Sequence, residues 1–178
     1  MDLLTKYTSE LPKIKEQFNI KNNLSVPKLE KIVLNMGLAE AISNKEVLEK
    51  AKEQLAQISG QMPKITRSKK AISNFKLRED EPIGAMVTIR GKRAWDFFTK
   101  LVAIVLPRIR DFRGLQESKF DKYGNYNLGI TEQILFPEIE YSKIDKIRGL
   151  NVSIVFKNSD PAKSKKLMEL LGIPFRQN

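Results

Sequence analysis

The chain has 178 residues, of which 32 are Lys or Arg and 21 are Asp or Glu, giving a formal charge of +11 at pH 7. It contains no Cys and no His, which excludes a disulfide framework, a thiolate nucleophile, a Cys-based zinc site and histidine base chemistry. With 41% hydrophobic residues, a chain of this length can form a core. The basic excess favours a polyanionic partner, either nucleic acid or an anionic lipid surface.

No targeting or membrane-spanning segment is expected. The segment 1–6 carries an acid and is not followed by an apolar run, so it does not resemble a secretory signal and an intracellular location is expected. The most apolar stretch, 101–106, is much shorter than the roughly 18 residues that a membrane span needs. Because no linker rich in Ser, Gly or Pro interrupts the chain, we expect one domain over residues 1–178.

The first third of the chain alternates helical and extended patterns. Apolar residues at helical spacing predict a helix up to about Phe18, broken or kinked at Pro12. A buried strand is predicted over 31–37. The next helix has capping-box spacing at 43–46 and ends at Ser59-Gly60.

Further elements follow in the same mixed order. They are strands at 63–68 and 85–90, separated by a basic stretch too long for a plain turn; a helix over 92–106 that stops at Pro107; short turns and strands over 108–148; a strand at 151–156; and a helix from Asp160-Pro161 to Leu171, ended by Gly172. Strands and helices mixed without a regular βαβ period indicate an α+β fold in two layers, with a mostly antiparallel sheet and helices packed on one face.

The basic residues gather in one track. It contains no acid before Glu79, and its cations are Lys64, Arg67, Lys69, Lys70, Lys76 and Arg78. Phe75 lies inside it, and an aromatic among cations suits a surface that contacts phosphates and stacks on a base. An isolated charge run is more often a solvated loop, but the net charge favours an RNA-binding surface. Smaller basic clusters lie at 90–93 and 108–113.

Polar residues inside apolar strands form a second group. Asn35 interrupts 32–34, Thr88 lies between Val87 and Ile89, and Gln61 follows the helix-ending glycine. Residues of this kind more often have a structural role with a satisfied hydrogen bond. If one sheet face meets RNA, however, neutral amides and hydroxyls can hydrogen-bond 2′-hydroxyl groups and base edges, so the three are candidates.

Two other classes of function stay open at this point. Asp111, Glu117 and Lys119 could serve a metal-dependent nuclease, although they lie close together in a loop punctuated by glycines and the signal is weak. A protein that binds anionic membranes is the third possibility, and no basic amphipathic helix supports it.

Several blocks of the chain resemble one family. They are 59–70, 75–79, 82–84, 107–115, 124–130, 136–139 and 171–175. In this order they are similar to the bacterial-type large-subunit ribosomal protein L5 family, whose members bind 5S ribosomal RNA. The resemblance covers nearly the whole chain.

The resemblance implies a non-enzymatic constituent of the central protuberance that helps attach 5S rRNA to the large subunit, with no cofactor and no metal. Family members present neutral polar side chains on one face of the sheet, at positions that fall here on Asn35, Gln61 and Thr88. The implied 5S rRNA contacts are Asn35, Gln61, Thr66, Arg67, Lys69 and Thr88.

The resemblance implies further partners. The loop 71–82 would lie near the peptidyl-site tRNA, with contacts from Lys70, Phe75, Lys76 and Arg78. Arg108, Arg110 and Arg113, together with 132–146, would face a small-subunit head protein in an intersubunit bridge. Other implied partners are 23S-type rRNA and neighbouring central-protuberance proteins, but no membrane. The implied location is a bacterial cytoplasmic ribosome, with an organellar one left open.

The chain departs from the family pattern in the same loop. Ser73-Asn74 replaces a small residue plus Gly, and Asn74 is expected to keep the loop path because it adopts positive φ more readily than most residues. Asp80-Glu81 replaces a Gly-plus-apolar pair, and the two acids lower the positive potential at the implied tRNA contact.

Overall fold

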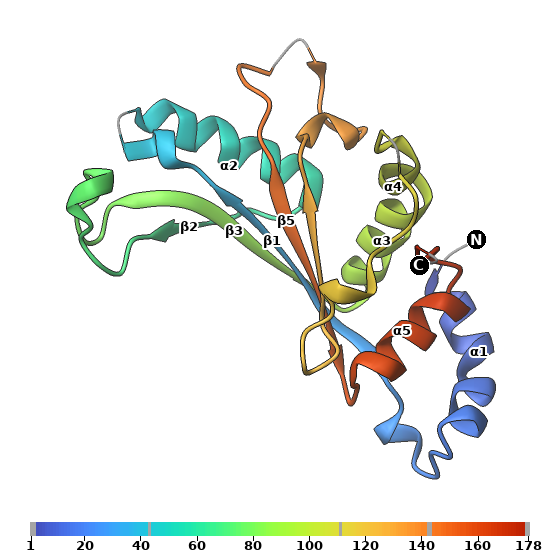
Figure 1. Cartoon of the computed structure of the whole chain (residues 1–178). Coiled ribbons are helices and arrows are strands. Elements are labelled where there is room, and N and C mark those ends of the chain that lie inside the picture. Colours follow the sequence, from blue (N-terminus) through green and yellow to red (C-terminus); the bar gives the residue numbers. More distant parts are fainter. Residues whose placement is uncertain (1–2, 43, 111, 142–143, 177–178) are drawn as a thin grey trace. The chain divides into compact units, whose positions relative to one another are not determined.

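The computed structural model describes residues 3–42, 44–110, 112–141 and 144–176 (Figure 1). Its strands are β1 (Lys28–Gly37), β2 (Lys64–Arg67), β3 (Pro82–Arg90), β4 (Tyr126–Ile130) and β5 (Leu150–Lys157). They form one five-stranded antiparallel sheet in the order β2-β3-β1-β5-β4. The helices are α1 (Leu3–Gln17), α2 (Lys45–Ser59), α3 (Lys92–Lys100), α4 (Leu106–Arg108) and α5 (Pro161–Leu170). The predicted α+β fold with an antiparallel sheet is confirmed.

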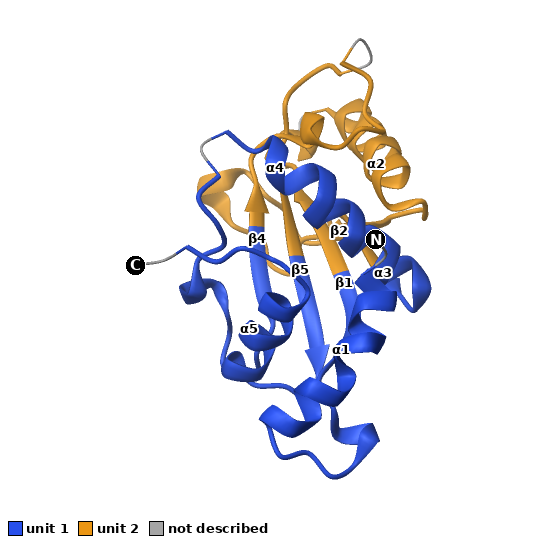
Figure 2. Ribbon diagram, turned by 90° about the vertical axis from the view of Figure 1, so that its right-hand side faces the viewer, with its two compact units in different colours: residues 1–32, 89–128, 153–178 blue, residues 33–88, 129–152 orange. Residues whose placement is uncertain are grey.

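The chain divides into two compact units, coloured in Figure 2. Unit 1 comprises 1–32, 89–128 and 153–178, and unit 2 comprises 33–88 and 129–152. The boundaries fall inside strands β1, β3, β4 and β5. The expectation of one domain over the whole chain stays a prediction.

Unit 2 contains helix α2. The helix begins after Asn44, whose side chain accepts a hydrogen bond from the Glu46 N–H at 2.9 Å, and it ends at Gly60, whose φ is +65°. Ser43, the first residue of the predicted capping box, lies outside the described residues. The buried face of α2 is made by Val47, Leu48, Ala51, Gln54, Leu55 and Ile58. Together with the buried residues of β1 and β3 that belong to unit 2, namely Leu34, Met36, Ala85 and Val87, this face contributes to the core of the unit.

Unit 1 contains the other helices, which lie on the same side of its strand segments in Figures 1 and 2. The ring of Tyr7 on α1 packs against Trp95 of α3 at 5.0 Å, and the Tyr7 hydroxyl donates to the Pro27 carbonyl at 2.9 Å. These contacts fix α1 against α3 and against the start of β1.

Both prolines lie inside helices. Helix α1 runs through Pro12 without a break; the ring removes only one N–H donor, and Thr8, whose carbonyl loses that donor, is exposed to water. The helix after β3 does not stop at Pro107 but continues to Arg108. It passes through a π-helical segment, Leu101–Val105, in which the Leu106 N–H bonds to the Leu101 carbonyl. This wider turn accommodates the proline before the helix ends.

The remaining boundaries agree with the predicted elements within a few residues. Asp160 caps α5 by accepting from the Lys163 N–H at 2.9 Å, with Pro161 at the first helical position. The segment 108–148 consists of short pieces, as predicted, and includes β4. No helix in the described part of the chain is long and apolar enough to cross a membrane.

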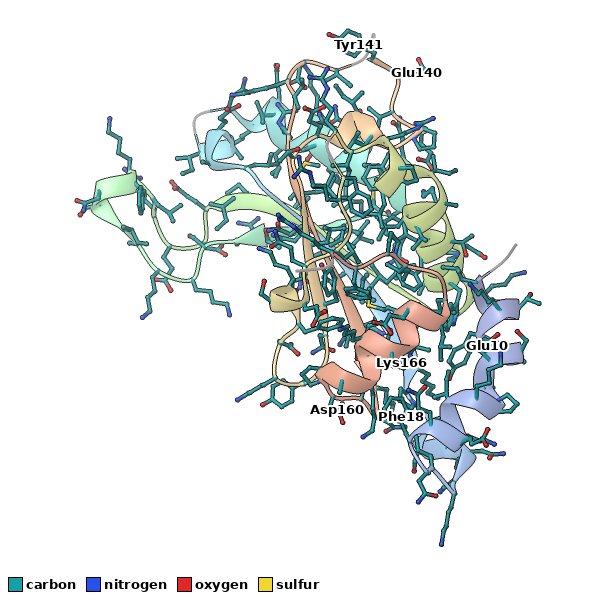
Figure 3. The ribbon with its side chains drawn as sticks, turned by 45° about the vertical axis from the view of Figure 1, so that its right-hand side comes forward. Glu10, Phe18, Glu140, Tyr141, Asp160 and Lys166 are labelled. Atoms are coloured by element: carbon teal, nitrogen blue, oxygen red, sulfur yellow. The ribbon has the colours of Figure 1, made fainter. Side chains whose placement is uncertain are left out.

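Gly124 provides a test of the packing between the turn before β4 and the start of α5. A Cβ atom there would lie 2.6 Å from the carbonyl carbon of Asp160, a residue labelled in Figure 3, and the φ of Gly124 is +79°. Gly60 also has a positive φ but no atom within 4 Å of its would-be Cβ. We expect Gly124→Ala to lower the free energy of unfolding by about 3 kcal/mol or more, and Gly60→Ala by about 1–2 kcal/mol. Urea unfolding measures both, and equal losses would contradict the packing argument.

Candidate nucleic-acid interface

Strands β1 and β3 have one buried and one half-exposed face. On β3, Ala85, Val87 and Ile89 are buried, while Met86 and Thr88 between them are half-exposed. On the neighbouring strand β1, the buried residues Leu34 and Met36 flank the half-exposed Asn35. Since side chains alternate between the faces of a strand, Asn35 and Thr88 both lie on the face opposite the core. We call this the open face of the sheet.

Strand β2 extends the open face within unit 2. Its register pairs Lys64 with Met86 and Thr66 with Gly84, and residues directly opposite in an antiparallel pair share a face. Thr66 and Lys64 therefore lie on the open face beside Met86. The pairing shifts between Thr66 and Arg67, which marks a bulge where the strand gives way to the following loop.

Gln61 lies against the same strand. Its side-chain N–H donates to the Thr88 carbonyl at 3.2 Å. The Ser59 hydroxyl holds the backbone at this point, because it lies within hydrogen-bond distance of two carbonyls, that of Leu55 at 2.7 Å and that of Gln61 at 2.9 Å, and its single proton can be donated to either. The structure thus brings Gln61 and Thr88 together, although 27 residues separate them in the sequence.

The polar side chains of the open face have few hydrogen-bond partners within the described part of the protein. Asn35, Thr66 and Thr88 are half-exposed, and among the described residues their side chains make no hydrogen bond. The side-chain carbonyl of Gln61 likewise accepts none in that part of the chain. A surface of this kind can donate and accept hydrogen bonds to a polar ligand without a charged group.

The loop between β2 and β3 has its own internal structure, shown in green in Figure 1 at the far end of this hairpin. Ile72 and Leu77 form an isolated bridge through two backbone hydrogen bonds of 2.9 and 3.1 Å, and a 3-10 turn, η3 (Ser73–Phe75), closes the end. The positive φ falls on Lys76 (+51°) and Asp80 (+65°). The expectation that Asn74 adopts it was wrong, because Asn74 lies inside the 3-10 turn.

The loop exposes cations around an aromatic side chain. Phe75 is 70% exposed. Four cations of the loop are exposed and make no ion pair in the described part of the chain: Lys69, Lys70, Lys76 and Arg78. Arg67 differs, since its guanidinium donates to the Asp80 carbonyl at 2.8 Å and pairs with the Asp80 carboxylate at 3.3 Å. Every predicted 5S rRNA and tRNA contact thus lies in unit 2. Asn35, Thr66 and Thr88 lie on the open face, Gln61 is bonded to the backbone of β3, and the others lie at the end of β2 or in this loop.

The three arginines predicted for the intersubunit contact lie in unit 1. Arg108 ends α4, and Arg110 and Arg113 follow in an irregular segment; all three are at least partly exposed. The segment is fixed to the C-terminal part of the chain, because the Leu115 N–H donates to the Pro174 carbonyl at 2.9 Å and the Leu115 carbonyl accepts from the Arg176 N–H at 2.9 Å.

The mixed-charge segment 132–146 lies in unit 2 and is organised by buried polar residues. Gln133 is fully buried; its amide donates to the Lys146 carbonyl at 2.7 Å and accepts from the Arg148 N–H. The Arg148 side chain is also buried and donates twice to Asp145, both at 2.8 Å. These bonds hold the pKa of the Asp145 carboxyl well below its usual range.

Sequence reasoning missed this network. The three-residue spacing from Asp145 to Arg148 was a possible signal, but nothing in the sequence indicates that Arg148 is buried or that Gln133 lies beside it. The same segment exposes Tyr141, labelled with Glu140 in Figure 3, which is 77% exposed.

The residues proposed for a nuclease do not form a metal centre in the described structure. No group of three or more acidic side chains that could hold an ion occurs among the residues described. Glu117 pairs with Lys165 at 2.6 Å, Lys119 is exposed, and Asp111 lies outside the described residues.

Comparison with known proteins identifies the class. Residues 22–78 match the family model described as ribosomal protein L5, and residues 82–175 match a second model, described as the C-terminus of the same ribosomal family. The chain belongs to the ribosomal protein L5 family. It is therefore a ribosomal protein and not an enzyme.

Curated relatives span the same length. The large ribosomal subunit protein uL5 of Desulfosudis oleivorans is 56% identical over 171 residues, covering 96% of each chain. That of Symbiobacterium thermophilum is 51% identical over 177 residues, covering 99% of this chain and 98% of the relative. The uL5 of Roseiflexus castenholzii is 51% identical over 175 residues, with 98% and 97% covered.

The Asp145–Arg148 pair predicts a pH dependence. Because folding lowers the pKa of Asp145, the pair stabilises the protein above the unfolded-state value near 4, and this stabilisation is lost as the pH falls toward the folded-state pKa. We expect Asp145→Asn to lower the free energy of unfolding at pH 7 by about 1–3 kcal/mol, and the difference from the parent protein to shrink below about pH 4.

Unfolding curves collected from pH 7 down to pH 2 measure this difference. Glu132→Gln is the matched control, since it removes an exposed carboxylate that makes no ion pair in the described residues. A deficit in Asp145→Asn that does not change with pH would contradict the assignment.

Proposed function

We propose that this protein is a structural constituent of the large ribosomal subunit, where it binds 5S rRNA and helps attach it in the central protuberance. The observation that carries the proposal is the open face of the sheet, where neutral polar groups without internal partners among the described residues lie on neighbouring strands. Structured RNA is recognised largely through its shape, its phosphates and its 2′-hydroxyls. Amides and hydroxyls that the strands hold in fixed positions are suited to hydrogen-bond the 2′-hydroxyls.

The proposed 5S rRNA contacts divide by chemistry. Asn35, Gln61, Thr66 and Thr88 supply hydrogen bonds that depend on the position of ribose and base groups. Arg67 and Lys69, at the end of β2 and the start of the loop, supply phosphate contacts. The first group gives selectivity, and the second gives affinity that falls as salt rises.

The loop after β2 is the proposed contact with the peptidyl-site tRNA. Lys70, Lys76 and Arg78 neutralise phosphates, and the exposed ring of Phe75 stacks on a base or ribose. The resemblance to the family implies this partner, and the exposed ring and the cations that make no ion pair within the described chain support the proposal.

Two further surfaces complete the proposal. Arg108, Arg110 and Arg113, and the segment 132–146, contribute to a bridge with a small-subunit head protein. The protein also contacts 23S-type rRNA and neighbouring proteins of the central protuberance. The protein works bound to a ribosome, in the bacterial cytoplasm or in an organelle.

Substitutions on the two surfaces should have different effects on RNA binding. Asn35→Ala or Gln61→Ala should weaken binding to 5S rRNA about two- to tenfold, the equivalent of one hydrogen bond, and leave binding to an unrelated RNA of equal length unchanged. Lys70→Ala should weaken binding to both RNAs and reduce the salt slope by about 0.7–0.9. Filter binding at several salt concentrations measures all of these.

Gln57→Ala is the control, because Gln57 is an exposed amide on α2, outside the strands of the open face. Equal losses on the two RNAs from Asn35→Ala would refute the division into selective and non-selective contacts. Absence of the tagged protein from purified large subunits that contain 5S rRNA would refute the proposed function itself.

A further inference from the structure

The two acids that depart from the family pattern form internal contacts at the base of the β2–β3 loop. The Glu81 carboxylate accepts a hydrogen bond from the Arg78 N–H at 2.9 Å. The Asp80 carboxylate and carbonyl both hold the Arg67 guanidinium. The loop has an outgoing arm, which continues from β2, and a return arm, which leads into β3. Asp80 thus contacts the outgoing arm at Arg67, and Glu81 contacts the return arm at Arg78.

Ser68 joins the two arms. Its N–H donates to the Glu81 carbonyl at 2.9 Å, its carbonyl accepts from the Asp80 N–H at 3.1 Å, and its hydroxyl donates to the Arg78 carbonyl. Ser68 is buried, at 8% exposure, between neighbours that are largely exposed. We call the residues Arg67, Ser68, Arg78, Asp80 and Glu81 the loop neck.

The neck supports the cationic tip, residues 69–77. The tip has little else to hold it, since most of its side chains are exposed and its own bonds are local to 72–77. Its position relative to the strands therefore depends on the neck. The return arm also has a positive φ at Asp80, where the family pattern has Gly, and Asp adopts this conformation more readily than most residues.

We propose that Asp80 and Glu81 are positioning residues for RNA binding: they fix the neck so that the tip presents Lys70, Lys76 and Phe75 in a preformed arrangement to the RNA backbone. This inference rests on the proposed function of the loop. Glu81 contributes most, because its carboxylate holds a backbone N–H, whereas the Arg67–Asp80 pair is exposed at 55% and 78% and contributes little by itself.

Asp80 and Glu81 could affect RNA binding through their charge alone or by positioning the tip. If they acted only through their charge, removing either would raise the positive potential and strengthen RNA binding. If they position the tip, removing the contact leaves a loop that must be ordered when RNA binds, and this ordering weakens binding. The two accounts predict changes of opposite sign.

Three variants with the same change in net charge separate the accounts. Glu79→Ala removes the neighbouring carboxylate, which is exposed and makes no hydrogen bond or ion pair in the described chain. Glu81→Ala removes the contact to the Arg78 N–H. Glu81→Gln keeps a side-chain carbonyl that can accept from the same N–H. Each variant raises the net charge by one.

The measurement is the affinity for a tRNA transcript at several salt concentrations. We expect Glu79→Ala to bind as tightly as the parent protein or up to about threefold more tightly. We expect Glu81→Ala to bind about three- to tenfold more weakly with an unchanged salt slope, since no phosphate contact is lost, and Glu81→Gln to resemble Glu79→Ala. Tighter binding by all three variants, in equal measure, would overturn the proposal.

Hydrogen exchange of the RNA-free protein provides the second readout. The Arg78 amide should exchange faster in Glu81→Ala than in Glu79→Ala or Glu81→Gln, and equal rates in the three would refute the positioning role. If Lys70→Ala and Lys76→Ala leave tRNA affinity unchanged, the proposed function of the loop fails. The Arg78 exchange rates, which need no RNA, still support or refute the role of Glu81 in holding the neck.

Discussion

The alternation of buried and half-exposed side chains along β1 and β3 is the constraint on which the candidate interface depends. Leu34, Met36 and Val87 must leave water, and this fixes which face of each strand is the core face. Because a strand alternates with a period of two, Asn35 and Thr88 then have to lie on the opposite face. A shift of register by one residue would bury these polar side chains and expose the apolar ones. The packing of the core therefore places the polar surface.

The net charge of +11 overstates the charge that is available to a partner. Arg148 is buried on Asp145, and Lys165 pairs with Glu117. These cations serve internal contacts. The exposed cations of the β2–β3 loop, by contrast, have no ion pair in the described chain, and they lie in the same unit as the neutral open face. Affinity from the loop and selectivity from the sheet thus have separate physical origins within unit 2.

The elements that follow from local pattern were predictable, and those that depend on contacts distant in sequence were not. The presence of a strand at β1 and the end of α2 at Gly60 can be inferred from a few adjacent residues. The alternation in β1 was not predicted, because its apolar run indicated a strand buried throughout. The effects of Pro12 and Pro107 could not, because they depend on whether water or a π-helical turn accommodates the missing donor. At the site, Asn35 and Thr88 were predictable as polar residues within strands. The hydrogen bond between Gln61 and Thr88 was not, since it joins residues that only the folded sheet brings together.

The loop neck shows why a departure from a family pattern has to be judged on the structure. From the sequence, Asp80-Glu81 in place of Gly plus an apolar residue is a loss of positive potential. In the structure, Asp80 adopts the positive φ that Gly would otherwise supply, and its side chain meets Arg67 across the neck. Glu81 binds the backbone of the return arm at the point where the chain turns back toward β3. Glu79, two residues earlier, carries the same charge and makes no hydrogen bond or ion pair within the described chain. These acids carry the same charge and differ in their contacts, so a count of charges along the loop cannot distinguish their effects on RNA binding. The hydrogen bonds of the neck distinguish them.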